Sequence, residues 1–357
     1  MGTAFTVTVG SITYEVVEDL EGRFDAVATG VIRDDVTLRA PRTEVSVTPS
    51  RAELDGRYLE SGAWGVSGAL ERALPGYPAA AETFDVQLSA PGYRPAALTV
   101  TVPAGAALPV GVADVELRPF PVRLEGRVTQ STLNPTPVAG AIVRIADRPG
   151  QALVALRTPV HSPHPQGTDV RPIDVVDTGT ERALAEPAES GAETVVLDDV
   201  TGLTGRVVGF DWQHQLELAR VQAVDVGSST ATLSGPLTRA YPRDTRLKQF
   251  TVSPGTPPSR QLDRDADAGD GLLVLDGALD PDTAAVQIGN PATPEVEFAA
   301  VGALSDDDGF YALEGIGGVE TVDLRGRATA VSPDGPRFPR TLEYGRRTNV
   351  VNLRLAP

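Results

Sequence analysis

The chain has 357 residues and a formal net charge of −17, from 31 Lys and Arg against 48 Asp and Glu. The absence of Cys excludes disulfides, thiolate nucleophiles and Cys-ligated zinc, and the negative charge argues against a nucleic-acid backbone as the partner. The length predicts two or three domains. The 36 Gly and 30 Pro indicate many short elements joined by tight turns.

Short alternating runs predict strands along the whole chain. TVTVG at 6–10, FDVQLSA at 84–90 and DVELRP at 114–119 alternate apolar and polar residues and end at turn residues. Helical periodicity is weak, and only 69–74 and 181–189 are compatible with a short helix. The sequence therefore predicts an all-β protein, with no cofactor and no apolar stretch long enough to span a membrane.

An internal repeat joins the N-terminal third to the C-terminal end. Residues 61–119 and 307–357 share a Gly followed by an aromatic residue, Trp64 or Phe310, then an alternating strand and a closing V-x-L-R motif. The second copy begins at 121–145 with PVRLEGRVT and PVAGAIVRI. About 160 residues without a counterpart separate its two parts, so an insertion splits the second copy.

The insertion repeats internally as well. Residues 154–171 align with 231–248 at a spacing of about 77. Residues 195–221 align with 273–301, and Glu217 falls opposite Glu297 when two extra loop residues are allowed. We therefore predict two related small β modules in tandem within the insertion.

These repeats divide the chain into four predicted parts. Residues 1–30 form an N-terminal β arm, and residues 31–120 form a first β-sandwich. Residues 121–148 and 302–357 form the second, split sandwich, and residues 149–301 form the inserted modules.

GRVT at 126–129, PVAGAIVRI at 137–145 and the turn Asp307–Tyr311 carry a family resemblance. Together they resemble the carboxypeptidase regulatory-like, or transthyretin-like, β-sandwich. The resemblance implies tandem transthyretin-like β-sandwiches, the second split by two small β-barrel-like modules. The insertion is similar to modules of phage-tail and contractile-injection accessory proteins. Such proteins are structural rather than enzymatic, and nothing in this chain resembles a peptidase zinc site.

The location follows from the N-terminal residues. They lack both the basic region and the apolar region of a secretory signal. The expectation is a protein made in the cytoplasm and assembled into a particle that can be released.

Two acidic segments are candidate sites. Asp263, Asp265 and Asp267 alternate as in the first half of a calcium-binding EF-hand loop, but Ala268 and Val274 stand where that loop needs Gly and Glu. A solvated acidic linker is the favoured interpretation of 263–271, and a calcium site is the alternative. SDDDG at 305–309 is predicted to be a structural turn, in which Asp accepts local N–H groups and Gly takes a positive φ.

The histidines are the candidate metal ligands. His161 and His164 are three residues apart in a Pro-rich segment, whereas His214 lies 50 residues further on. Zinc requires a third or fourth ligand at a defined spacing. The repeat places Thr238 and Tyr241 at the equivalent positions of the other module, so we predict a shared turn without a metal.

The two tryptophans have different predicted roles. Trp64 stands at the strand start that the two sandwiches share, which favours a core position. Trp212 lies in GFDWQHQ at 209–215, between two strands of the insertion. This position predicts a loop tip, where Trp212 is a candidate exposed contact.

The chain is predicted not to be an enzyme. It has no G-x-S-x-G elbow and no phosphate-binding loop, and Lys248 is its one Lys. The favoured function is a structural component of a phage-tail-like contractile injection particle or related prophage assembly, bridging subunits or copies of itself. The alternative is an adhesin or carbohydrate-binding accessory module that uses the loops around Trp212.

Overall fold

The computed structural model describes residues 4–9, 12–17, 24–41, 43–69, 80–212, 215–290, 293, 296–328, 336–344 and 346–355. Within these ranges every regular element is a strand, which confirms the all-β prediction, and there is no helix of the length and apolarity needed to cross a membrane. The chain forms two compact units. The first comprises Met1–Phe120, Gly318–Glu320 and Tyr344–Arg346, and the second comprises the remaining residues.

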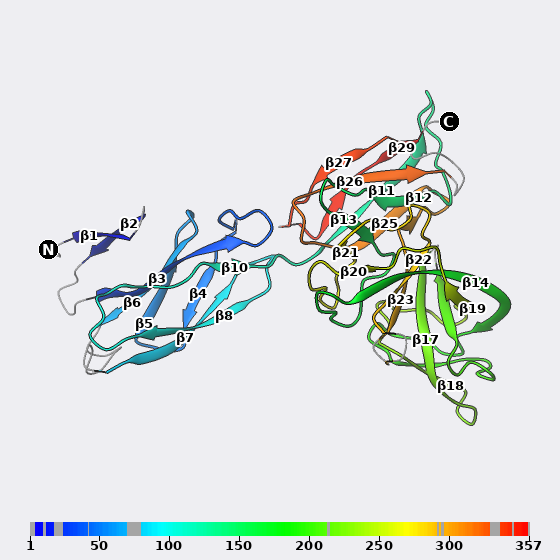
Figure 1. Cartoon of the computed structure of the whole chain (residues 1–357), viewed down its shortest axis with the longest axis horizontal. Helices are drawn as coiled ribbons and strands as arrows, with labels where there is room; N and C mark the ends of the chain where they lie inside the picture. The colour runs from blue at the N-terminus through cyan, green and yellow to red at the C-terminus, as the bar shows by residue number, and fades with distance from the viewer. Residues whose placement is uncertain are drawn as a thin grey trace. The chain divides into compact units, whose positions relative to one another are not determined.

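The first unit holds a two-layer β-sandwich (Figure 1). One layer has the order β10-β3-β6-β5, with β9 also paired to β3, and the other has the order β4-β7-β8. Trp64, fully buried on β6, lies in the core between the layers, as predicted. β1 and β2 form a separate antiparallel pair. The strands are β1 (Ala4–Val9), β2 (Ile12–Val17), β3 (Phe24–Asp34), β4 (Ser46–Pro49), β5 (Leu54–Tyr58), β6 (Ala63–Ala69), β7 (Glu82–Ser89), β8 (Ala96–Val102), β9 (Val110–Gly111) and β10 (Val115–Leu117).

A second sandwich of the same design lies in the second unit. Its layers are β25-β11-β28, with β29 also paired to β11, and β24-β12-β26-β27. In both sandwiches the last strands run parallel to the first strand, as β10 does to β3 and β29 to β11. The strands are β11 (Val122–Gln130), β12 (Ile142–Ile145), β24 (Ala303–Leu304), β25 (Phe310–Ile316), β26 (Thr321–Arg327), β27 (Phe338–Thr341), β28 (Thr348–Val350) and β29 (Leu353–Leu355).

Register corrects two details of the predicted sandwich repeat. Trp64 pairs with Gly30, and the residue that pairs with the corresponding Gly126 is Tyr311, not Phe310. Tyr311 is fully buried, like Trp64. The sequence comparison aligned Trp64 with Phe310 instead of Tyr311, because both residues after Gly309 are aromatic. β3 also begins at Phe24, inside the range predicted as the N-terminal arm, because its pairing with β6 starts there.

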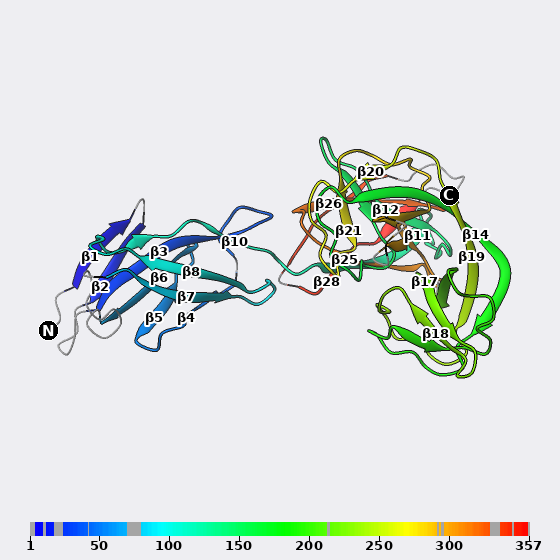
Figure 2. The ribbon, with the colours of Figure 1, turned by 60° about the horizontal axis from the view of Figure 1, so that its bottom comes forward.

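The insertion forms a nine-stranded sheet with the order β15-β18-β17-β16-β19-β14-β22-β23, and β20 also pairs with β14. β14 is the longest strand of the insertion, and β19 runs beside it and pairs with it (Figure 2). The strands are β13 (Ala152–Ala155), β14 (Asp169–Ala183), β15 (Thr194–Val196), β16 (Val207–Trp212), β17 (Gln215–Asp225), β18 (Thr230–Leu233), β19 (Arg246–Pro254), β20 (Arg260–Gln261), β21 (Leu272–Leu275), β22 (Ala285–Ile288) and β23 (Glu297–Ala300).

The two modules of the insertion are nested rather than placed one after the other. We call the end of β14, β15 to β18 and the start of β19 the continuous module. The split module consists of β13, the start of β14, the end of β19, and β20 to β23. Each module therefore combines one segment from each copy of the sequence repeat, because β14 and β19 pass through both modules and pair with each other along the way.

Equivalent residues pair identically in the two modules. Phe210↔Glu217 between β16 and β17 corresponds to Ile288↔Glu297 between β22 and β23. Leu247↔Phe210 corresponds to Val170↔Ile288. The bridge Leu184↔Leu197, which links the residues just after β14 and β15, corresponds to Leu262↔Leu275. The described strands of the insertion form an open sheet, and only isolated bridges link strands that are not neighbours in it. The sequence resemblance implied barrel-like modules, and closed barrels are not formed by these strands.

Each module has its own apolar core, and a third cluster joins them. Leu156 and Leu233 occupy equivalent, fully buried positions in the split and continuous cores. The joining cluster contains Ile173 and Phe250, which lie on β14 and β19 respectively. β14 also contributes Val170 to the split core, and β19 contributes Leu247 to the continuous core, so the joining cluster links the interiors of the two modules.

Two sequence interpretations of the insertion are wrong. Residues 181–189 were compatible with a short helix, but Glu181 lies in β14 and pairs with Lys248 of β19, so tertiary pairing overrides the local composition. The acidic segment 263–271 is not a solvated linker. Ala266 is 4% exposed and forms a β-bridge with His164 in the core of the split module.

Candidate functional site

A buried carboxylate and two histidines form a polar cluster in the insertion. Glu297, 4% exposed on β23, accepts hydrogen bonds from the backbone N–H groups of His161 and Ser162 at 3.1 and 2.7 Å. Its two oxygens also lie 3.1 Å from His161 Nδ1 and from His164 Nε2. One side chain thus holds the whole turn that contains the HSPHP motif.

The continuous module holds the same turn with the equivalent acid. Glu217, 5% exposed on β17, accepts hydrogen bonds from the Thr238 backbone N–H and the Tyr241 hydroxyl, each at 2.7 Å. Thr238 and Tyr241 correspond to His161 and His164. The sequence comparison had aligned all three pairs, but it did not indicate that the acid and the turn are in contact.

The two acids differ electrostatically because their partners differ. Burial raises the pKa of Glu297, but hydrogen bonds and positive charge from His161 and His164 outweigh burial and bring that pKa to about 2. Burial also raises the pKa of Glu217, and there the hydrogen bonds from Thr238 and Tyr241 do not compensate. The same structural position therefore holds a strongly acidic carboxyl group in one module and a weakly acidic one in the other.

The contacts of this cluster stabilise the turn that contains His161 and His164. His161 and His164 each point a ring nitrogen at a different oxygen of Glu297. Any side chain at Gly235 would overlap the His161 ring, so the ring is enclosed on that side. Within the described part of the chain no group of three or more His, Asp or Glu residues is arranged to hold a metal ion. His214 lies outside the described residues.

The acidic segments use their carboxylates to hold backbone groups. Asp265 accepts the Gln166 N–H at 2.7 Å, and Asp270, 7% exposed, accepts the Asp267 N–H at 2.9 Å. In the 305–309 turn Asp306 accepts the N–H groups of Asp308 and Phe310 at 3.0 and 2.7 Å. Gly309 has φ +74°, so the predicted structural turn is confirmed.

Trp212 lies at the end of β16 and pairs with Gln215 at the start of β17, with 40% of its surface exposed. The position is a hairpin end, as expected from the sequence. The split module has Asn290 at the equivalent position. The contact made by Trp212 stays a prediction.

The sandwich edges differ in how they are protected. β27, the edge of the second sandwich, has four residues and includes Pro339 and Arg340. β8 occupies the same place in the first sandwich, where it pairs with β7 and with no other described strand. It has seven residues, AALTVTV, with no charge and no Pro. Pro and charged residues are the usual protection of an edge strand against pairing with another chain, so β8 is an unprotected edge.

Comparisons with known proteins identify no family. No family model matches the chain, and no curated protein matches it. Among solved structures the chain is similar to a variant of the major pilin subunit of Bacillus cereus, with 9% identity and a TM-score of 0.22. The match covers 94% of this chain and 100% of the pilin chain. This similarity is too distant to support an argument about function, so the chain is defined by its own architecture: two β-sandwiches, the second split by two nested β modules.

Proposed function

We propose that this protein is a non-catalytic structural protein that joins subunits by strand pairing at the edge of its first sandwich. The observation that carries the proposal is the unprotected strand β8, beside the protected edge β27 of the same chain. An edge strand presents a row of backbone N–H and C=O groups that a strand from another chain can complete.

Charge favours this edge over the rest of the surface. Two copies of a chain with net charge −17 repel each other at most orientations. β8 itself contributes no charge, so a partner strand approaches it with the least repulsion. The partner that the proposal commits to is a second copy of this chain.

The finer proposal is a component of a phage-tail-like contractile injection particle or related prophage assembly. Its support is the sequence resemblance of the insertion and of the two sandwiches. The nested modules suit a structural role, because their shared strands and joined cores favour a rigid body that can hold a fixed spacing between subunits.

Thr101→Lys is expected to weaken self-association by about tenfold or more, because a charged side chain on an edge strand disfavours pairing with another chain. Thr101 is exposed on β8, and the matched control is Gln87→Lys, which is exposed on the same face of the central strand β7. Sedimentation velocity over a range of concentrations measures the effect. A wild-type chain that stays monomeric throughout, or equal association of the two variants, would contradict the proposal.

The second candidate, a carbohydrate-binding accessory module, is favoured by one observation, the 40% exposure of Trp212 at a hairpin end. Sugars stack on exposed aromatic rings. If this candidate is correct, a glycan array is expected to give a signal that Trp212→Ala abolishes. Phe120→Ala, at an aromatic residue with 48% exposure, is expected to leave the signal intact. No wild-type signal on the array excludes this candidate.

A further inference from the structure

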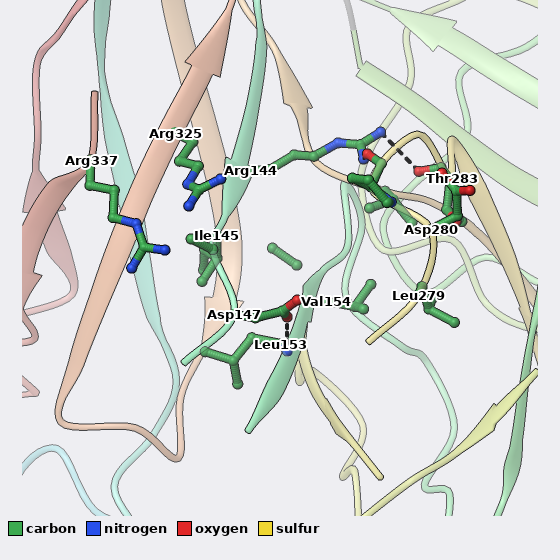
Figure 3. Close-up of a pocket in the computed structure, with 14 residues that line it drawn as sticks. Arg144, Ile145, Asp147, Leu153, Val154, Leu279, Asp280, Thr283, Arg325 and Arg337 are labelled. Atoms are coloured by element: carbon green, nitrogen blue, oxygen red, sulfur yellow. Dashed lines mark hydrogen bonds between the residues drawn. The ribbon is translucent and has the colours of Figure 1, made fainter. Parts of the chain in front are cut away.

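A cavity of about 290 Å³ lies between the second sandwich and the split module (Figure 3). The sandwich contributes three arginines to its lining, Arg144 on β12, Arg325 on β26 and Arg337 before β27. Asp147 and Asp280 are the acidic residues of the lining. The cavity thus has more positive than negative groups in a chain whose net charge is −17.

Strand register concentrates this positive charge. Arg144 and Arg325 are direct partners across the antiparallel pair β12 and β26. Like charges placed directly opposite each other destabilise a sheet. Arg337 reaches the same cavity, where its guanidinium group lies near that of Arg325 (Figure 3). The guanidinium group of Arg144 turns away from Arg325, so Arg325 and Arg337 supply the positive charge on the sandwich side of the cavity (Figure 3).

Neighbouring groups hold four charged residues of the lining, Arg144, Asp147, Asp280 and Arg337. Arg144 turns towards the split module and donates to the carbonyls of Pro281 and Thr283. Asp147 accepts the Leu153 N–H at 2.8 Å, and Asp280 accepts the Asp282 N–H at 2.8 Å, so both carboxylates serve local backbone groups. Arg337 lies 3.6 Å from Asp323 of the sandwich. The cavity is therefore preformed rather than assembled by a ligand.

The opposite wall is apolar. Leu153 and Val154 of β13, with Leu279 and Val301, line the cavity from the split module. A ligand that fills the space must match both walls, with oxygen atoms towards the arginines and carbon towards the aliphatic side chains. Ligand pockets combine an apolar wall with a few placed polar groups in this way.

We propose that this cavity binds a small organic oxyanion, a carboxylate or phosphate group with a short apolar body. Guanidinium groups bind both carboxylate and phosphate through paired N–H···O hydrogen bonds. Arg325 and Arg337 hold the oxyanion, and Arg144 fixes the loop that closes the cavity over the apolar body. The inference does not depend on strand pairing at β8, because the cavity belongs to the other unit of the chain.

The test is titration of the full chain with hexanoate, acetate, inorganic phosphate and chloride at equal ionic strength, followed by calorimetry and thermal melting. Hexanoate is expected to bind more tightly than acetate if the apolar wall takes part. Phosphate binding without a preference for hexanoate over acetate would assign the site to phosphate compounds. Chloride is expected to give no specific stabilisation.

Arg325→Gln is expected to weaken oxyanion binding by about tenfold or more, because a charge-assisted hydrogen-bonding group is lost. Without an oxyanion the variant is expected to melt near the wild-type temperature, because Gln keeps the first part of the aliphatic stem of the side chain. The matched control is Arg57→Gln in the first unit, where the side chain is 81% exposed and the charge change is the same.

Three outcomes would overturn the proposal. The first is that no oxyanion binds wild type more tightly than chloride. The second is equal oxyanion binding by the Arg325 and Arg57 variants. The third is a lower melting temperature of Arg325→Gln without any oxyanion, which would make Arg325 a structural residue.

Discussion

Replacing Glu297 with Gln is expected to lower the free energy of unfolding by about 1–3 kcal/mol at neutral pH, the usual cost of leaving a buried hydrogen-bonding group without its partner. Gln keeps the size of the side chain but removes the charge that His161 and His164 surround. Its amide oxygen can accept only one of the two backbone N–H groups that Glu297 accepts, and its NH2 group cannot accept the other. Urea unfolding measures the loss.

The pH dependence gives this prediction a second readout. The pKa of Glu297 is about 2 in the folded chain and near its ordinary value when unfolded. A lowered folded pKa stabilises the protein above the unfolded pKa, and the stabilisation disappears as pH falls through about 4.5 towards 2. Glu297→Gln is expected to remove this acid-dependent loss of stability, so the difference between wild type and variant shrinks as pH falls.

Glu217→Gln is the matched control, and its pH dependence has the opposite sign. The pKa of Glu217 is raised in the folded chain. Its contribution is therefore present below the unfolded pKa and is lost as pH rises through the folded pKa. Removing the carboxylate is expected to cost less at neutral pH than removing Glu297, and the cost grows rather than shrinks at low pH. If the loss of stability changed with pH in the same way for both variants, the predicted electrostatic difference between Glu217 and Glu297 would be wrong.

Leu156→Ala and Leu233→Ala are each expected to destabilise the insertion by about 2–5 kcal/mol, the range for buried Leu to Ala. Both side chains are at most 3% exposed and occupy equivalent positions in the split and continuous cores. Because β14 and β19 contribute to both modules, the two substitutions are expected to shift one common unfolding transition. Calorimetry measures the number of transitions.

Leu133→Ala is the control for this pair, because Leu133 is fully exposed and its truncation is expected to leave stability unchanged. The informative alternative is selective melting. If Leu233→Ala unfolds the continuous module at a temperature at which the split module stays folded, the shared strands do not couple the modules.

Local pattern was enough to predict the strands and much of the core. Alternation of apolar and polar residues predicted strand at β7, where buried Phe84, Val86 and Leu88 alternate with exposed residues. Gly and Asp at 306–309 predicted the turn before β25, because only a few residue types tolerate that backbone geometry. Local pattern was misleading at 181–189. The composition there is compatible with a helix, but residues 181–183 belong to β14 and pair with β19.

The candidate site was only partly visible in the sequence. The repeat aligned Glu217 with Glu297, and Thr238 and Tyr241 with His161 and His164. It could not show that each acid holds its turn, because the contact joins residues 136 positions apart in one module and 21 in the other. Nothing in the sequence indicated the arginine-lined cavity, because its walls come from six separate stretches of chain.

The sequence by itself determined the all-β class, the sandwich repeat and the repeat within the insertion, because these depend on local alternation, turn residues and similarity between segments. The tertiary structure alone decided that the inserted modules exchange segments and share β14 and β19. It also decided that β8 is an unprotected edge and that three arginines meet at one cavity. The physical reason is that strand partners are chosen by backbone hydrogen bonds between distant segments, and the side-chain pattern of a single strand does not encode its partner.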